Sequence, residues 1–287
     1  MTRDARFDLA RQALGPLAIF AALLGIVALA VPEFLGGGGP SIIAQQATPI
    51  LLVALGQCVV LQIGSIDLSN AATGLFCTIL AALTLGPLGV AAPVLCLVVV
   101  TLIGIVNGLL LVHTQIPSFA LTLGTLGVMQ AAALVVTGSN VVYVMDNMDV
   151  VAWLFTVQVL TLPAAFWIAL QLAVALWAFL RFTAWGQGLA AIGFNERAAA
   201  LSGQPVAALK VLAFALSGFF AGLAGLCVIS ISGAASSIGL GSDLLVPSIA
   251  AALVGGTAIT GGAIAASGDA YSKTSHGLST GDRVVLN

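Results

Sequence analysis

Asp67 is the residue best placed to do chemistry, because it puts a carboxyl group inside a long apolar stretch. Between residues 34 and 145 the only other side chain of the Asp, Glu, Lys, Arg or His types is His113. A carboxyl group at membrane depth is costly and indicates a transport pathway or a helix cap. Asp67 is followed by Leu68, Ser69 and Asn70, which also suits a helix N-terminus. We favour the cap over direct contact with a transported molecule, although a broken helix that faces a cavity would satisfy both.

Further polar groups gather in the segment HTQIPSFALTLGT, residues 113–125, and just before it. Hydroxyl groups beside an aromatic ring suit a neutral ligand with many hydroxyls. The alternative stays open, because Ser and Thr in membrane helices often bond their own backbone. We predict that a substrate pathway is lined or supported by Asp67, Asn70, Asn107, Ser118, Phe119 and Thr122.

The sequence contains no recognisable catalytic motif. Patterns of the GxxxxGK[ST], HExxH and GxSxG kinds are absent, so we expect no catalytic residue and no ATP hydrolysis by this chain. Its four cysteines lie in apolar stretches without a CxxC pair, which favours buried small hydrophobes over a metal or redox site. We expect neither a metal nor a cofactor, and the few basic residues exclude a nucleic-acid partner.

The composition defines the elements that must position these groups. Hydrophobic residues make up 60% of the 287 residues, charged residues 6%, and the mean hydropathy is +1.18. These values exclude a soluble domain. The apolar stretches are long enough for membrane-spanning helices, so we predict an all-α, polytopic bundle of about seven or eight spans. The predicted spans are residues 14–31, 42–63, 68–85, 88–112, 116–137, 156–180, 211–231 and a shorter 244–260.

The basic residues are confined to a few places. No Lys or Arg occurs between Gln12 and Leu180, whereas Arg3, Arg6 and Arg11 precede this region and a polar island at residues 181–210 follows it. Cytoplasmic loops are enriched in such residues, so the N-terminus and the island are both predicted to be cytoplasmic, with six crossings between them. We interpret the first apolar run as a retained helix, because it is longer than the core of a signal peptide.

The island also predicts a surface for a partner protein. A short amphipathic helix that carries Glu196 and Arg197 is expected between Gly193 and Gly203. Such a helix suits docking. The alternative is a solvated loop that only sets the orientation.

Four segments together resemble the permease subunits of bacterial ABC sugar importers, the family of ribose, arabinose, xylose and autoinducer-2 permeases. They are IGSIDLSN around residue 67, GIVNGLLLVHTQIPSFALTLGT at 104–125, GQGLAAIGFNERAAALSGQPV at 186–206 and SIAAALVGGTAITGG at 248–262. The resemblance implies that the island is a cytoplasmic coupling loop that docks on the ATPase. The predicted coupling residues are Gly193, Asn195, Glu196, Arg197, Ala198 and Gly203, with Ala199 at a further matching position.

The chain departs from this family in three places. Ser65 stands where glycine is usual, and LLVP precedes Ile249 in place of an acidic and aromatic pattern. Beyond residue 262 the family continues with further membrane helices, whereas here residues 263–287 form a polar tail. We therefore divide the chain into a permease domain, residues 1–262, and a tail unlike the family, and we expect a truncated or fused reading frame or a divergent member.

The resemblance implies a permease subunit of the bacterial inner membrane that carries a monosaccharide or related small polyol. Its expected partners are cytoplasmic ATPase subunits, which would bind the ATP, an extracytoplasmic binding protein and a second permease copy. Three alternatives remain at this point: a branched-chain amino acid permease, an ion-coupled secondary carrier, and a truncated fragment that does not transport.

Overall fold

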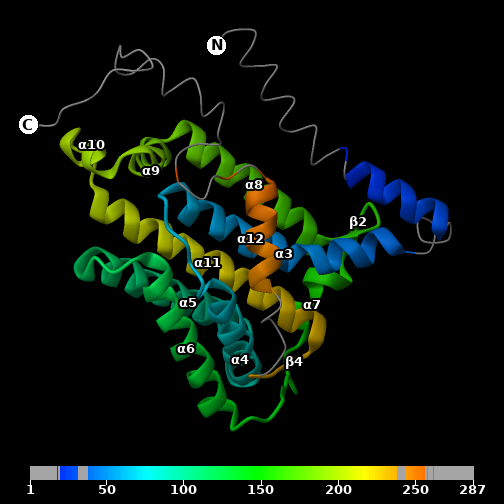
Figure 1. Cartoon of the computed structure of the whole chain (residues 1–287). Helices are drawn as coiled ribbons and strands as arrows, with labels where there is room; N and C mark the ends of the chain where they lie inside the picture. The colour runs from blue at the N-terminus through cyan, green and yellow to red at the C-terminus, as the bar shows by residue number, and fades with distance from the viewer. Residues whose placement is uncertain are drawn as a thin grey trace, which may run out of the picture.

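The structure, a computed structural model, describes residue 18, residues 20–31, 38–237 and 244–255, and residues 257 and 261. The predicted polar tail and the basic cluster at residues 3–11 lie outside this part of the chain. The described residues form a helical bundle with two small two-stranded sheets (Figure 1). The prediction of an all-α polytopic fold is confirmed.

Six described helices are long and apolar enough to cross a membrane. They are α3 (Gly39–Gln62), α4 (Asn70–Leu88), α5 (Ala91–Thr114), α6 (Ser118–Thr137), α8 (Ala164–Phe182) and α11 (Val206–Ser232). The helix Phe20–Ala30 covers the described part of the first predicted span. The last predicted span corresponds to α12 (Leu245–Val254), whose ten residues extend only about 15 Å, half of the thickness of a bilayer core.

Helix α8 begins eight residues later than the predicted span 156–180. The short helix α7 (Asp149–Thr156) precedes it, followed by a hairpin of β2 (Gln158–Val159) and β3 (Leu162–Pro163). The two turn residues, Leu160 and Thr161, have φ values of 50° and 67°, as a two-residue hairpin turn requires. These positions usually carry Asn or Gly, so the sequence contains no signal for this hairpin.

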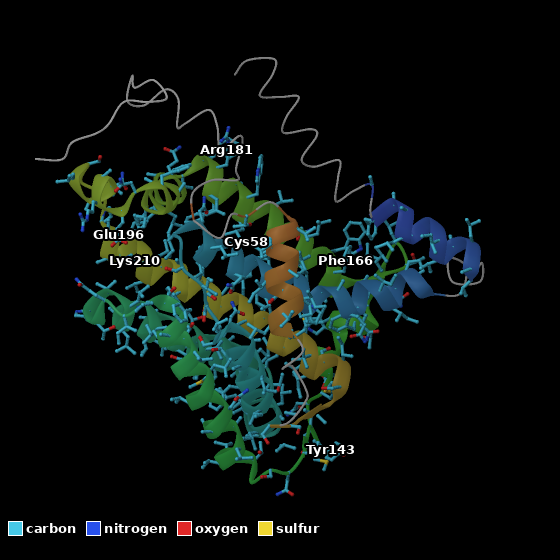
Figure 2. All side chains as sticks on the ribbon, viewed as in Figure 1. Cys58, Tyr143, Phe166, Arg181, Glu196 and Lys210 are labelled. Carbon is cyan, nitrogen blue, oxygen red and sulfur yellow. The ribbon has the colours of Figure 1, made fainter. Side chains whose placement is uncertain are left out.

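The bundle has two distinct ends. At one, which we call the strand end (residues 85–91, 138–148 and 232–235), β1 (Val142–Tyr143) pairs antiparallel with β4 (Ala234–Ala235). Nδ2 of Asn147 there donates to the carbonyl oxygens of Leu85 and Gly86, at 3.1 and 3.0 Å. The opposite end, which we call the α10 end, holds α9 (Ala184–Phe194) and α10 (Glu196–Leu201). Figure 2 shows Arg181, Glu196 and Lys210 at this end, away from Tyr143.

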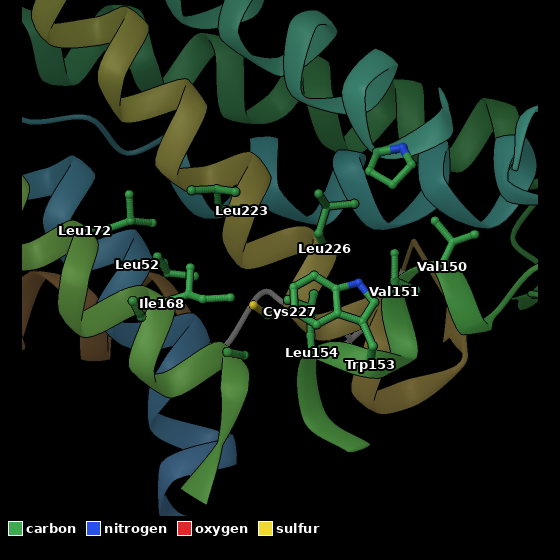
Figure 3. A pocket seen from close by; sticks show the side chains of 13 residues that line it. Leu52, Val150, Val151, Trp153, Leu154, Ile168, Leu172, Leu223, Leu226 and Cys227 are labelled. Carbon is green, nitrogen blue, oxygen red and sulfur yellow. The ribbon is translucent and has the colours of Figure 1, made fainter. Parts of the chain in front are cut away.

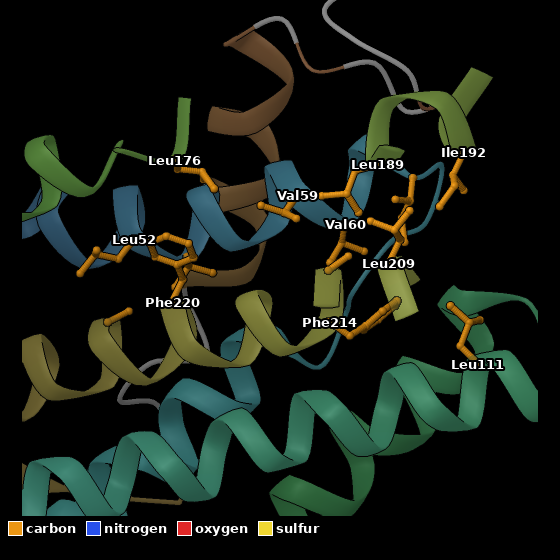
Figure 4. Close-up of a cluster of buried hydrophobic side chains, with 14 of the residues drawn as sticks. Leu52, Val59, Val60, Leu111, Leu176, Leu189, Ile192, Leu209, Phe214 and Phe220 are labelled. Carbon is orange, nitrogen blue, oxygen red and sulfur yellow. The ribbon is translucent and has the colours of Figure 1, made fainter. Parts of the chain in front are cut away.

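Helix α11 lies at the centre and packs against α3, α4 and α5. Its crossing with α5 is a direct backbone contact, because a Cβ added at Gly108 would lie 2.7 Å from Cα of Val211, and one at Gly104 would collide with the carbonyl oxygen of Phe214. Figure 4 shows the apolar core on the other side of α11, which includes Leu52, Val59, Val60, Leu189, Ile192, Leu209, Phe214 and Phe220.

Candidate functional site

The connection between α3 and α4, residues 63–69, is a buried segment without helical structure. Helix α3 ends at Gln62, and Gly64 follows with a φ of 70°, a backbone conformation that stops a helix. Ser65, Asp67 and Ser69 are each less than a tenth exposed. In Figure 1 this segment runs from the α10 end back into the bundle before α4 begins. The polar sequence IGSIDLSN therefore forms a break between two membrane helices.

Hydroxyl groups of α6 hold the backbone of this break. The N–H of Ile66 donates to Oγ of Ser118, and the N–H of Leu68 donates to Oγ1 of Thr122, both at 3.0 Å. The hydroxyl proton of Thr122 has its nearest acceptor in its own helix, the carbonyl oxygen of Ser118 at 2.9 Å, and the carbonyl oxygen of Ile66 is 3.3 Å away. Non-helical backbone at membrane depth has to find such partners within the protein. Ser118 and Thr122, one helical turn apart, supply them.

Asp67 uses both of its carboxyl oxygens. The N–H and the hydroxyl of Ser69 donate to Oδ1, at 3.0 and 2.6 Å, and the hydroxyl of Ser217 donates to Oδ2 at 2.7 Å. Ser217 is the eleventh residue after Val206 in α11, so the contact lies about 16 Å along that helix from its start. The carboxyl group is therefore deep within the bundle and bonded to neutral donors.

Two asparagine side chains extend this cluster to α5 and α6. Asn70 donates from Nδ2 to Oγ of Ser217 at 2.5 Å. Asn107 donates from Nδ2 to Oγ of Ser69 at 3.0 Å, and its Oδ1 accepts from Oγ1 of Thr125 at 2.7 Å. We call the whole set the polar network: Asp67, Ser69, Asn70, Asn107, Ser118, Thr122, Thr125 and Ser217. It joins the break to three other helices.

The structure brings five of the six predicted pathway residues together in this network. The exception is Phe119, which is 55% exposed on the surface of α6. Sequence reasoning missed Ser217 and Thr125, which look like ordinary hydroxyl residues in apolar helices. One atom of the network, Oδ1 of Asn70, is buried and has no partner among the described residues. Gly56 of α3 lies against Asn70, since a Cβ added there would be 2.9 Å from Nδ2 of Asn70.

The pocket in Figure 3 has a different character. Its volume is about 300 Å³, and its lining of α3, α5, α7, α8 and α11 residues includes Trp153, Leu154, Ile168, Leu172 and Cys227. Hardly any polar group faces it. A hydroxylated ligand would lose its hydrogen bonds there without replacement, which costs several kcal/mol. We therefore do not place a pathway for a polar molecule in this pocket.

The island folds as two helices at the α10 end. Oγ1 of Thr183 accepts the N–H of Gly186 at 3.1 Å and caps α9. Asn195 interrupts the helix with extended backbone (φ −162°, ψ 103°), and its Oδ1 accepts the N–H of Ala198 at 3.0 Å to start α10. Gly203, with a φ of 80°, follows the end of α10. The short helix expected between Gly193 and Gly203 is present.

Two contacts fix α10 against the bundle. Nζ of Lys210, in the first turns of α11, lies 2.7 Å from Oε1 of Glu196, and the methyl group of Ala199 is buried. Leu201 points the other way and is 90% exposed, and Arg197 and Ala198 are exposed as well. The island therefore presents a fixed helix with an outward apolar side chain.

The six apolar helices and the relatives described next define a class of protein, a multi-pass permease of the inner membrane. Residues 39–273 match the family described as "Branched-chain amino acid transport system / permease component", and the chain belongs to this family. It is a permease subunit of an ABC importer rather than an enzyme.

Three relatives illustrate the similarity. The ribose import permease protein RbsC of Haemophilus influenzae is 33% identical over 84% of this chain and 75% of its own length. The autoinducer 2 import system permease protein LsrC of Salmonella paratyphi B is 31% identical over 84% of this chain and 71% of its own length. The L-arabinose ABC transporter permease protein AraH of Azospirillum brasilense is 29% identical over 88% of this chain and 75% of its own length. No solved structure gives a significant match.

Proposed function

We propose that this chain carries a monosaccharide or a related small polyol through the membrane as the permease subunit of an ATP-driven importer. The observation that carries the proposal is the break at residues 63–69, which places a buried network of hydroxyl, amide and carboxyl groups deep among membrane helices. Such groups suit a neutral molecule that both donates and accepts hydrogen bonds. The sugar permeases among its relatives support this substrate class over branched-chain amino acids.

Asp67, Asn70, Asn107, Ser118 and Thr122 would support the pathway, and Phe119 would offer its ring from the surface of α6. The unpaired Oδ1 of Asn70 supports this assignment, because a sugar hydroxyl that reached it could donate a hydrogen bond to it. Residues that bond one another in one state of the bundle would exchange these bonds for substrate in another.

We further propose that α10 docks on a cytoplasmic ATPase subunit. Gly193, Asn195, Glu196, Arg197, Ala198 and Gly203 would form the coupling loop, and the N-terminus would share its side of the membrane. Two ATPase subunits, a second permease copy and an extracytoplasmic binding protein would complete the importer. ATP would bind to the ATPase subunits, and their movement would shift the bundle between outward-open and inward-open states.

The transport test uses the chain reconstituted in liposomes with its ATPase subunit and its binding protein. We expect ATP-dependent uptake of at least one labelled pentose or hexose and no uptake of labelled leucine. Leucine uptake would instead support the amino acid permease. Uptake that follows an imposed ion gradient without ATP would support the secondary carrier, and absence of any uptake would support the non-transporting fragment.

A further inference from the structure

Thr257, which follows α12, contacts α3 near its end. The N–H of Thr257 donates to the carbonyl oxygen of Ala252 at 3.2 Å, and its hydroxyl donates to Sγ of Cys58 at 3.3 Å. Cys58 lies four residues before Gln62, the last residue of α3. This contact places Thr257 beside the last turns of α3, which lead into the break.

Gly261 then lies directly against two other stretches of backbone. A Cβ added to Gly261 would be 2.8 Å from Cα of Gly193, 2.9 Å from its carbonyl oxygen and 2.8 Å from the backbone nitrogen of Gly64. Side-chain carbons do not approach other atoms this closely, and main-chain atoms cannot rotate away as a side chain can. Its φ of 84° is a further reason why only glycine suits this position. We call the contact of Gly64, Gly193 and Gly261 the glycine junction.

The glycine junction connects the two candidate sites. Gly193 is the last residue but one of α9 and lies two residues before Asn195, which caps α10. Gly64 lies three residues before Asp67 in the break. No side chain stands between the three backbones. A displacement of α9 at this point would therefore be transmitted by backbone contact, because close-packed groups without flexible side chains transmit strain.

We propose that Gly261 is a positioning residue for the transport cycle, which sets the spacing between the coupling loop and residues 63–69. This inference rests on the proposed function, since it needs α10 to dock on the ATPase. Movement of α9 and α10 then displaces the break, and with it the hydrogen bonds from Ser69 and Ser217 to Asp67. When the close contact is disturbed, ATP hydrolysis continues, but movement of the coupling loop no longer displaces residues 63–69.

The test compares sugar uptake per ATP hydrolysed for the reconstituted importer with wild-type chain and with Gly261→Ala. We expect the ratio to fall about tenfold in Gly261→Ala, within the usual range of coupling between sites, while recovery of the ATPase subunit on the tagged permease is unchanged. Gly38→Ala is the matched control. Gly38 also has a positive φ, 86°, but a Cβ there meets nothing within 4 Å, so we expect the wild-type ratio.

If the unmodified importer takes up sugar and Gly261→Ala has the same ratio of uptake to ATP hydrolysis, the role of the junction is overturned and the proposed function stands. A wild-type importer that takes up no sugar would overturn both. If Gly261→Ala fails to fold, Thr257→Val decides the question, because it removes the hydroxyl bonded to Cys58 without adding bulk. We expect this variant to lower the ratio about fivefold, and an unchanged ratio would overturn the inference.

Discussion

Asp67 is stabilised by one partner that is close in sequence and by one that is distant. Ser69 is two residues from it, and Ser217 is 150 residues from it. The local partner comes with any chain that contains the motif, whereas the distant one requires α11 to pack against the break. A buried carboxyl group that loses a hydrogen-bond donor has no water to replace it. The hydrogen bonding of the Asp67 carboxyl group therefore depends on the packing of α11 against the break, through the hydroxyl of Ser217.

Replacing Ser217 with alanine should destabilise the chain by about 2 kcal/mol, because Oδ2 of Asp67 loses its donor and Nδ2 of Asn70 keeps only the more distant of its two acceptors, the carbonyl oxygen of residue 217. Equilibrium unfolding by denaturing detergent in mixed micelles measures this change. The control is Ser232→Ala, in the same helix, whose exposed hydroxyl bonds to backbone near the helix end and whose loss should cost under about 0.5 kcal/mol. Equal midpoints for the two variants would contradict the prediction.

The polar network was predictable only in part. Asp67, Asn70 and Asn107 are conspicuous because amides and carboxyls are rare in apolar spans, and Ser118 follows Pro117, with Thr122 one helical turn further on. Ser217 carries no comparable signal, since a serine in a membrane helix usually bonds its own backbone. Its role comes from a contact with a residue 150 positions earlier, which no local pattern encodes.

Helix α10 is too short to be stable by itself, because a single turn and a half does not repay the cost of helix initiation. The Asn195 cap, the buried Ala199 and the ion pair of Glu196 with Lys210 hold it in place. Glu196 therefore holds α10 in position, whereas Leu201, on the outward face, is free to contact a partner.

Leu201→Asp should reduce recovery of the ATPase subunit on the tagged permease roughly thirtyfold, the equivalent of about 2 kcal/mol for a central interface side chain. The measurement is quantitative co-purification from membranes that contain both proteins. The matched control is Leu160→Asp, at a side chain that is 79% exposed in the β2–β3 turn, for which we expect wild-type recovery. Wild-type recovery with Leu201→Asp would count against docking through this face.

The glycines show where sequence reasoning about elements stops. Gly104 and Gly108 in α5 lie about one helical turn apart, as do Gly124 and Gly127 in α6, but a Cβ at Gly124 or Gly127 would meet nothing within 4 Å. The first pair faces α11 at a backbone contact. The approximate positions of the six long described helices follow from hydropathy, while the face that each helix turns to its neighbour depends on the assembled bundle.

The whole molecule has a strand end and an α10 end, and the proposed orientation gives them different surroundings. The strand end is joined by β1 and β4 and by the hydrogen bonds of Asn147. It would face the binding protein, and the α10 end would face the ATPase. The distribution of Lys and Arg supports this assignment.

The orientation can be tested with single cysteines in a variant whose four native cysteines are replaced by alanine. A membrane-impermeant maleimide should label Leu160→Cys in intact spheroplasts and Ala198→Cys only after permeabilisation, because both positions are exposed, Leu160 before the start of the membrane-spanning α8 and Ala198 after its end. Immunoblotting of the labelled protein gives the readout. The reverse pattern would show that α10 lies outside the cell.

The separation of Asp67 from Ser217 also has a consequence for biosynthesis. A ribosome that adds about 5–20 residues per second makes Ser217 roughly 8–30 s after Asp67. During this interval α3 and α4 have been made, yet the break between them lacks its partner on α11, and exposure of its carboxyl group to lipid would be costly. We expect the newly made helices to remain beside the insertion machinery until α11 arrives. The synthesis of Ser217 would then limit the rate at which these helices assemble in the membrane.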